Sequence, residues 1–173
     1  MFKKMIKPKY PPRHWSLVGY PGSGKSTFAA KMDGPKLVID SDHRFSEAME
    51  IGDDTYALSD DPMDNVDTDN IYRELHRNMP NSGIKTIIVD SLTAIITPIV
   101  MKVMIDKEKG RSRNLMAGMK EKAMAMRQLQ DAVSRWGTDI LWIYHLQDGR
   151  DGRSNEVTKN SISETELARL MRS

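Results

Sequence analysis

The eight residues from Gly19 to Ser26 restrict the fold of this chain strongly. They read G-Y-P-G-S-G-K-S and fit the pattern G-x-x-x-x-G-K-[ST] at every fixed position. An apolar run from His14 to Gly19 predicts a buried strand before the motif, and Ser23 to Met32 predicts a helix after it. Glycines allow the backbone between such a strand and helix to curl, so that its N–H groups point inward around an anion. The segment therefore predicts an α/β fold with an anion-binding loop.

The same motif carries the chemical groups that bind a nucleoside triphosphate. Lys25 supplies a positive charge for the β- and γ-phosphates, and the Ser26 hydroxyl can coordinate Mg²⁺. The helix that begins beside Gly24 adds the positive end of its dipole. We therefore expect this P-loop to hold ATP with Mg²⁺. The residues expected to contact the nucleotide are Gly19, Tyr20, Pro21, Gly22, Ser23, Gly24, Lys25, Ser26 and Thr27.

Strands and helices alternate along the rest of the chain. Each predicted strand is a short, continuous apolar run, which is typical of a parallel sheet covered by helices on both faces. We therefore predict a three-layer α/β fold in a single domain, residues 1–173, with an extended lead-in at 1–13 and a mobile loop at 146–162. The further strands are expected at Lys36–Asp40, Thr55–Leu58, Lys85–Asp90 and Ile140–Tyr144.

Helices are expected between these strands and at the end of the chain. A short one is predicted from Arg44 to Ile51, one from a cap at Asp67-Thr68 to Met79, and a last one with a capping box at Ser163 and Glu166. A polar loop is expected from Asp106 to Asn114. The helix predicted from Leu115 to Trp136 has an apolar stripe that should face the core. The stripe consists of Leu115, Met119, Ala123, Met126, Leu129, Val133 and Trp136. The methionines from Met116 to Met126 are expected to serve core and subunit packing.

Asp90 is the second candidate for the phosphate site. It ends the run T-I-I-V-D, and an acid at the carboxyl end of a buried parallel strand lies at the sheet edge where ligands bind. Downstream of a P-loop, such an acid is expected to hold Mg²⁺ through water. The predicted metal ligands are therefore Ser26 and Asp90.

The charges are segregated along the chain, although the net charge is only +2. From Asp40 to Asp69 the acids are opposed by Arg44 alone, whereas cations predominate from Lys102 to Arg135. One face could therefore meet a polyanion. The absence of cysteine excludes disulfides and cysteine nucleophiles. No apolar run approaches the ~20 residues of a membrane span, and no signal peptide is evident, so we expect a cytoplasmic protein without membrane contact.

The chain from Trp15 to Leu170 resembles the RecA-like ATPases in its order of elements. The phrase Ile39-Asp40-Ser41-Asp42-His43 matches the end of that family's second strand and places Asp42 at the position of the carboxylate that activates water, where the family usually has glutamate. Acids here can also cap the next helix. The stretch from Asp90 to Pro98 resembles the segment after the family's second motif. His145, directly after the last predicted strand, stands where the family usually has a glutamine that senses the γ-phosphate.

The resemblance implies an ATPase that acts on single-stranded DNA in recombination or annealing, in a bacterial or phage-infected cell. Within this family the chain resembles the small phage-encoded RecA-like proteins linked to single-strand annealing, and the resemblance implies catalytic roles for Lys25, Asp42 and His145. The family assembles as filaments or rings, so a homo-oligomer is expected. The residues implied to bind DNA lie in two loops and are Lys107, Lys109, Arg111, Arg113, Arg150, Arg153 and Lys159.

Two other classes of function remain open from the sequence. A kinase of a small molecule or nucleotide also needs a P-loop, and the arginines of either loop could close over its phosphates as a lid. A nucleotide-gated interaction module that hydrolyses ATP slowly is the other, because Asp42 is shorter than the usual glutamate. Stimulation of ATP hydrolysis by single-stranded DNA would distinguish a RecA-like ATPase from both the kinase and the slow interaction module.

Overall fold

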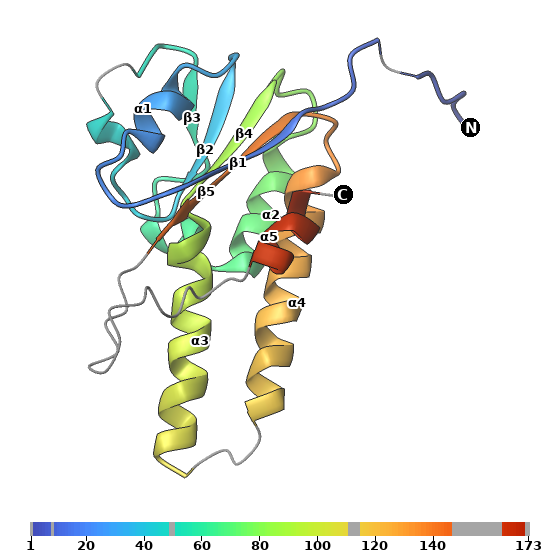
Figure 1. Ribbon diagram of the computed structural model, residues 1–173. Coiled ribbons are helices and arrows are strands. Elements are labelled where there is room, and N and C mark those ends of the chain that lie inside the picture. The colour runs from blue at the N-terminus through green and yellow to red at the C-terminus, as the bar shows by residue number, and fades with distance from the viewer. Residues whose placement is uncertain (1, 8, 49–50, 111–114, 147–163, 172–173) are drawn as a thin grey trace.

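The computed structural model has a five-stranded parallel sheet at its centre (Figure 1). Its described residues are 2–7, 9–48, 51–110, 115–146 and 164–171. The strands lie in the order β1-β5-β4-β2-β3, and every pairing between neighbours is parallel. This architecture confirms the predicted α/β fold. The strands are β1 His14–Gly19, β2 Lys36–Asp40, β3 Thr55–Ala57, β4 Thr86–Asp90 and β5 Asp139–His145.

Helices cover both faces of the sheet, which gives three layers. Figure 1 shows α1 on one side of the sheet and α2 to α5 on the other. The central strand shows why: Ile87 and Val89 pack against the larger group of helices, and Ile88 between them packs with residues of α1. Such alternation follows from the period of two along a strand. The helices are α1 Lys25–Ala30, α2 Thr68–Asn78, α3 Leu92–Glu108, α4 Leu115–Ser134 and α5 Glu164–Met171, with 3₁₀ turns at Phe45–Glu47 and Pro62–Asn65.

Most predicted elements agree with the structure to within two residues. Asp67 caps α2, as expected, by accepting hydrogen bonds from the backbone N–H groups of Asp69 and Asn70. The helix expected from Arg44 to Ile51 is only a short 3₁₀ turn within the described residues. Its start is fixed by the Asp40 carboxylate, which accepts from two successive backbone N–H groups. Residues 2–7 and 9–13, which belong to the predicted lead-in, contain no helix or strand.

The loop expected from Asp106 was placed too early. α3 continues through Glu108, so Lys107 lies in the last turn of a helix, and Lys109 directly follows that helix. Lys and Glu favour helix, and Gly110, with φ of 65°, takes the left-handed conformation that commonly follows a helix end. Pro98 stands inside α3 without ending it.

The apolar stripe of α4 faces the core only along the inner half of the helix. Met126, Leu129 and Val133 are buried, but Met119 is 54% exposed and Ala123 is also exposed. The prediction that the whole stripe faces the core was therefore wrong. Figure 1 shows the reason: α3 and α4 lie side by side and project well beyond the sheet, so the outer half of α4 meets no strand. No helix in the described part of the chain has the length and apolar character needed to cross a membrane.

An ion pair at the amino edge of the sheet joins the lead-in to β5. Arg13 donates to Asp139 from its backbone N–H at 2.8 Å and from its guanidinium at 2.7 and 3.0 Å. Burial acts to raise the pKa of Asp139, but the hydrogen bonds from Arg13 outweigh it, so the pKa lies below its ordinary value. Arg13 also contacts Asp33, whose side chain is 75% exposed.

We predict that Asp139→Asn lowers stability in a pH-dependent way. A carboxyl with a depressed pKa in the folded state stabilises the fold above its unfolded pKa of ~3.9, and this contribution is lost as the pH falls through the folded value. The urea midpoint of the variant should therefore lie below that of the wild type at neutral pH, and the difference should shrink under acid. Asp33→Asn is the matched control and should change little; an equal loss in both variants would contradict the assignment.

Candidate nucleotide-binding site

The register of the sheet brings all the predicted catalytic residues to its carboxyl edge. Gly19 at the end of β1 pairs with His145 at the end of β5, and Asp40 at the end of β2 pairs with Asp90 at the end of β4. Because β5 lies between β1 and β4, His145 stands between the P-loop and the acid-bearing strands. Strand order and register together thus assemble the site from four strand ends.

Two glycines give the P-loop its tightly turned backbone. Gly22 and Gly24 have φ of 79° and 80°, in the left-handed region that residues with a Cβ rarely adopt. Gly24 precedes α1, and its carbonyl accepts the first helical hydrogen bond, from Phe28, at 2.9 Å. The first α1 residue is therefore Lys25 rather than the predicted Ser23, and the helix N-terminus faces the loop's cavity.

A cavity of about 420 Å³ opens between the P-loop and the ends of the other strands. This volume is within the range of ~300–1,000 Å³ usual for ligand sites. Its walls come from the P-loop, from the acid-bearing strand ends and from the turn after β2. The lining residues are Pro21, Gly22, Gly24, Lys25, Ser26, Thr27, Asp42, Arg44, Glu47, Ala48, Asp90 and His145.

Lys25 is a buried cation in the wall of this cavity, with 7% of its surface exposed. Its ammonium donates to the carbonyls of Gly19 and Tyr20, at 3.1 and 2.6 Å, and to Ser23 Oγ at 3.1 Å. Burial lowers the pKa of Lys25, and the negative charges of Asp90 and Asp42 act in the opposite direction. The P-loop thus holds a poorly solvated positive charge where the motif predicts a phosphate.

Asp90 is buried opposite Lys25, with 3% of its surface exposed, and accepts a hydrogen bond from Ser26 Oγ at 2.6 Å. Burial raises the pKa of this carboxyl; the Ser26 bond lowers it, while Asp42 raises it further. The two predicted metal ligands are therefore in direct contact, although 64 residues separate them in sequence.

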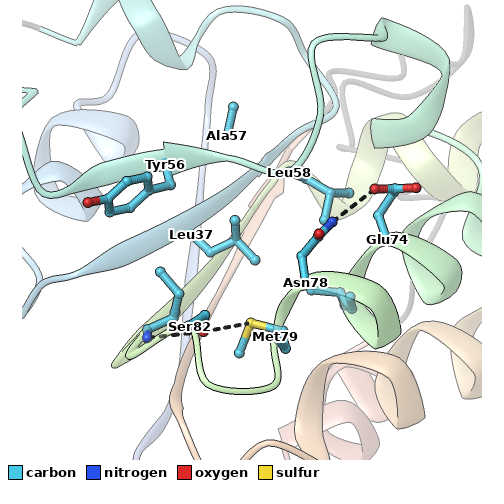
Figure 2. Close-up of a pocket in the computed structure, with 10 residues that line it drawn as sticks. Leu37, Tyr56, Ala57, Leu58, Glu74, Asn78, Met79 and Ser82 are labelled. Carbon is cyan, nitrogen blue, oxygen red and sulfur yellow. Dashed lines mark hydrogen bonds between the residues drawn. The ribbon is translucent and has the colours of Figure 1, made fainter.

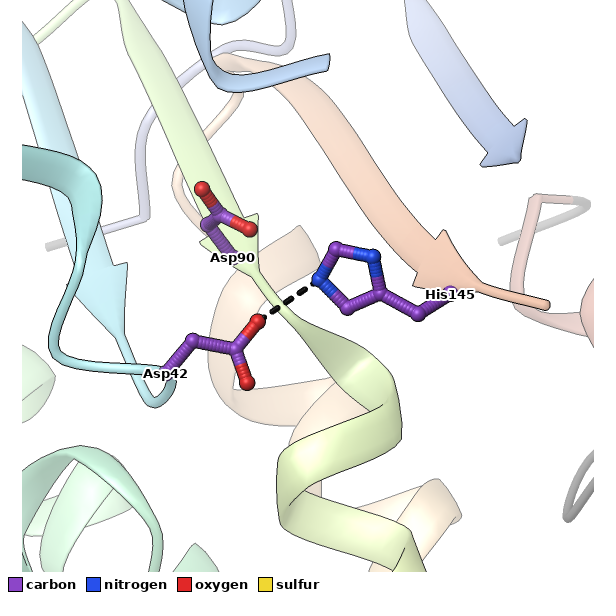
Figure 3. Close-up of side chains that lie close together, drawn as sticks. All are labelled: Asp42, Asp90 and His145. Atoms are coloured by element: carbon purple, nitrogen blue, oxygen red, sulfur yellow. Dashed lines mark hydrogen bonds and ion pairs between the residues drawn. The ribbon is translucent and has the colours of Figure 1, made fainter. Parts of the chain in front are cut away.

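Asp42 and His145 form a hydrogen-bonded pair beside Asp90 (Figure 3). Asp42 Oδ2 lies 2.7 Å from His145 Nε2, and because a carboxylate can only accept, Nε2 carries the proton. His145 Nδ1 is buried without a hydrogen-bond partner among the described residues. Backbone contacts fix the pair: Asp42 N–H donates to the Asp90 carbonyl, and His145 N–H to Thr93 Oγ1 at 2.8 Å. The residues expected to activate water and to sense phosphate are thus in contact with each other.

The donor set fits a divalent cation. Ligand atoms of Asp42, Asp90 and His145 lie within 4.8 Å of one another, and the Ser26 hydroxyl touches Asp90. Mg²⁺ prefers oxygen ligands, which Ser26 and Asp90 supply, and a cation would offset the burial of the Asp90 charge. His145 is the poorer Mg²⁺ ligand of the group, since its Nε2 is already bonded to Asp42.

Some site residues were missed or fall outside the described chain. Arg44 and Glu47 line the cavity and form an ion pair at 3.1 Å. The sequence could have indicated Arg44, because it is the only cation among the acids from Asp40 to Asp69. Thr93 had no sequence signal. Lys107 and Lys109 lie at the far end of α3, away from this cavity. The other residues predicted to bind DNA, Arg111, Arg113, Arg150, Arg153 and Lys159, lie outside the described residues, as does the predicted loop 146–162 except for Leu146.

We predict that Asp90→Asn stabilises the protein in the absence of nucleotide. A carboxyl with a raised pKa destabilises the fold once it ionises, so the penalty is absent in acid and complete at neutral pH. At pH 7 the melting temperature of the variant should be a few degrees above that of the wild type, because each kcal/mol of stability shifts it by ~2–4 °C. The asparagine still accepts the hydrogen bond from Ser26 but carries no charge. Mg²⁺-ATP should raise the melting temperature of the wild type but not of the variant. A lower melting temperature of the variant without nucleotide would refute this account.

A family model described as AAA domain matches residues 12–171, almost the whole sequence. None of the curated proteins matches the chain. Together with the parallel sheet and the P-loop cavity, the family match shows that this chain belongs to the AAA domain family of P-loop nucleotide-binding ATPases.

Proposed function

We propose that this protein is a RecA-like, Mg²⁺-dependent ATPase that acts on single-stranded DNA in recombination or annealing. The observation that carries the proposal is the Asp42–His145 hydrogen bond inside the P-loop cavity. An ATPase that responds to a polymer needs a link between the group that positions water and a group that reports the state of the phosphate. Here the two groups share one bond of 2.7 Å.

Five residues of the cavity have roles that their positions support. Lys25 and the P-loop N–H groups bind and neutralise the phosphates. Ser26 and Asp90 would hold Mg²⁺, which would supply further positive charge for the phosphates. Asp42 orients the attacking water and accepts its proton. The Nε2–H group of His145 donates a hydrogen bond to Asp42 and so holds the carboxylate in place, until a phosphate oxygen competes with Asp42 for this hydrogen bond.

α3 provides a route from the cavity to a distant surface. It begins two residues after Asp90, and Thr93 in its first turn accepts the hydrogen bond from the His145 backbone. At 1.5 Å per residue, a helix of this length extends for ~25 Å. A shift of His145 would therefore move the first turn of α3, and the helix would transmit this movement to Lys109, which directly follows its last residue.

The projecting pair of helices α3 and α4 is the surface that we assign to DNA. Its exposed cations are Lys102 on α3, Lys109 directly after α3, and Lys120 and Arg127 on α4, and its exposed acids are Glu108, Glu121 and Asp131. With the predicted loop cations, the surface carries a net positive charge. Contacts to phosphates by such side chains do not read sequence and weaken strongly with salt.

We further propose that the protein works as a homo-oligomer, a filament or a ring. The cavity holds Lys25 as its one buried cation among the described residues, whereas phosphoryl transfer usually needs a further positive group at the γ-phosphate. Arg44 lies in the wall but is paired with Glu47 and faces solvent. A cation from a neighbouring copy would complete the site.

Asp42→Asn should lower kcat for ATP hydrolysis by ~10²–10⁴ with little effect on ATP binding, because general-base assistance is of that order. His145→Gln, which keeps a hydrogen-bond donor, should retain more activity than His145→Ala. Steady-state kinetics with a binding titration on the same preparations test both. Asp53→Asn, an exposed acid outside the cavity, is the control. Unchanged kcat in Asp42→Asn would remove Asp42 from the mechanism.

Single-stranded DNA should stimulate ATP hydrolysis at low salt, and the stimulation should disappear at high salt. Lys25→Ala is the blank. Changing Lys107, Lys109, Arg111 and Arg113 to glutamate should abolish the stimulation by DNA but leave DNA-independent hydrolysis intact. Lys85→Glu is the matched control: Lys85 is exposed and directly precedes β4, at the amino end of the sheet, so this variant should keep the stimulation. Hydrolysis that is indifferent to DNA would contradict the DNA proposal and favour a kinase or a slow nucleotide switch.

A further inference from the structure

Asp42, Asp90 and His145 lie close enough together to hold one ion between them (Figure 3). Within the described part of the chain they are the one group of at least three His, Asp or Glu side chains whose ligand atoms all lie within 4.8 Å of one another. The chain contains 24 acidic residues, yet the many acids from Asp53 to Asp69 form no such group. The fold, and not the local density of acids, therefore creates this convergence.

Three neighbouring strands carry the ligands. His145 ends β5, Asp90 ends β4, and Asp42 lies two residues past the end of β2; the three strands are adjacent in the order β5-β4-β2. Hydrogen bonds fix the spacing of the last two strand ends. The Asp42 N–H donates to the Asp90 carbonyl at 3.3 Å, and Ser41 Oγ donates to the Ser91 carbonyl at 2.7 Å. The sheet thus positions the ligands before an ion binds, as a preorganised site requires.

The donor atoms of this group suit Zn²⁺ better than they suit Mg²⁺. Mg²⁺ prefers oxygen ligands in octahedral geometry, whereas an imidazole nitrogen together with carboxylates is typical of Zn²⁺. Zinc sites that keep an open position have three protein ligands of these types. Here two carboxylates and one imidazole supply three ligands, and a cavity of about 420 Å³ lies on their open side.

Small movements of the side chains would bring the three ligands to bonding distance. Two ligand atoms at ~2.0–2.1 Å from a tetrahedral ion lie ~3.3 Å from each other. Asp42 Oδ2 and His145 Nε2, now 2.7 Å apart, must therefore separate slightly, and wider gaps within the group must close from no more than 4.8 Å. The side chains of His145 and Asp42 are 20% and 27% exposed and line the cavity, so they have room to rotate.

The proton on His145 Nε2 can move within the ring. Nε2 donates it to Asp42, and a nitrogen that binds a metal ion needs its lone pair free. Nδ1 can take up the proton, because its lone pair has no hydrogen-bond partner among the described residues. Binding at Nε2 then leaves the imidazole neutral, which is the form that ligates metal ions.

A second cavity, beside β3, has no comparable set of ligands (Figure 2). Its volume is about 220 Å³, and its walls are mostly apolar, with Leu37, Leu58 and Met79 among them. Glu74 is the one acid that lines it, and its carboxylate accepts a hydrogen bond from Asn78 at 3.0 Å. A metal ion bound by several side chains is therefore expected at the carboxyl edge of the sheet and not in this cavity.

We infer that Asp42, Asp90 and His145 bind one Zn²⁺ ion and that this ion blocks the hydrolysis of ATP. The ion occupies the carboxylate that orients water and the histidine that holds this carboxylate, and it competes with Mg²⁺ for Asp90. The block of hydrolysis rests on the proposed function. Binding of the ion rests only on the three side chains and requires no nucleotide.

A titration of the full-length, nucleotide-free protein with Co²⁺ tests the site, because Co²⁺ adopts the geometries of Zn²⁺ and its visible spectrum reports its ligands. Four- or five-coordinate Co²⁺ absorbs much more strongly than the six-coordinate ion in water. We expect one equivalent of Co²⁺ to produce the strong absorption and Zn²⁺ to abolish it by displacement. Mg²⁺ at the same concentration should not displace the Co²⁺, since it lacks affinity for imidazole.

His145→Gln should lower the affinity for Co²⁺ by at least ~10-fold and remove the strong absorption, since even changes beside a metal ligand cost that much. Asp42→Asn should do the same. His43→Asn is the matched control, because His43 is exposed next to Asp42 and asparagine tolerates its φ of 56°. Zn²⁺ should raise the melting temperature of the wild type and of His43→Asn but not of the other two variants, and the same melting curves show that all are folded.

A weak, six-coordinate spectrum that His145→Gln leaves unchanged would overturn the inference, because the ion would then have oxygen ligands alone. Loss of the strong absorption in His43→Asn would overturn it as well. The block is measured with Mg²⁺-ATP: half-inhibition of the wild type should need at least ~10-fold less Zn²⁺ than that of His145→Gln, each relative to its own rate without Zn²⁺. Equal inhibition of both would refute the block. A strong Co²⁺ spectrum without any hydrolysis of ATP would refute only the proposed function, whereas DNA-stimulated hydrolysis without that spectrum would refute only the zinc site.

Discussion

The position of β5 between β1 and β4 is the constraint on which the site depends. Parallel pairing places all carboxyl ends at one edge, but the strand that separates the P-loop from Asp90 decides which side chain stands between them. β5 continues beyond β4, so His145 reaches the level of Asp42, two residues past the end of β2. A chain with β4 directly beside β1 would bring Asp90 to the P-loop but leave no strand end to contact Asp42.

The buried charges of the site lower the free energy of unfolding, and the apolar core beneath them compensates for this loss. Lys25 and Asp90 are both almost fully buried, and burial disfavours the charged form of each. Their mutual attraction offsets part of this, as does the hydrogen bond from Ser26. Beneath them, Ile88, Leu141 and Ile143 form a fully buried layer with α1. Opposed buried charges over a rigid apolar layer are typical of binding sites whose ligand supplies the missing counter-charges.

The sequence predicted those parts of the fold that depend on local patterns. Apolar runs defined all five strands, and Asp67 marked the start of α2, because a capping carboxylate acts within three residues. The P-loop and Asp90 were predicted from motifs whose chemistry requires their residue types. One prediction failed because distant packing decides: the exposure of Met119 depends on how far α4 projects past the sheet. The helical state of Lys107 instead follows from local helix preferences, and α3 ends at Glu108, before Gly110. The contact between Asp42 and His145, 103 residues apart, requires strand order, which no local pattern contains.

The two ends of the sheet carry opposite kinds of surface, and this division has a physical basis. At the carboxyl end, helix N-termini and backbone N–H groups create positive potential suited to phosphate. At the amino end, α1, α2 and α4 end shortly before β2, β4 and β5, so these helices direct their carbonyl ends there. The segment from Asp40 to Asp69 begins at the catalytic edge, where Asp42 and Glu47 line the cavity, and it continues through β3 at the lateral edge of the sheet. β3 pairs with β2, and the end of β2 carries Asp40 and leads into Asp42. The edge strand β3 is therefore connected to the catalytic residues through β2 and the 3₁₀ turn that follows it.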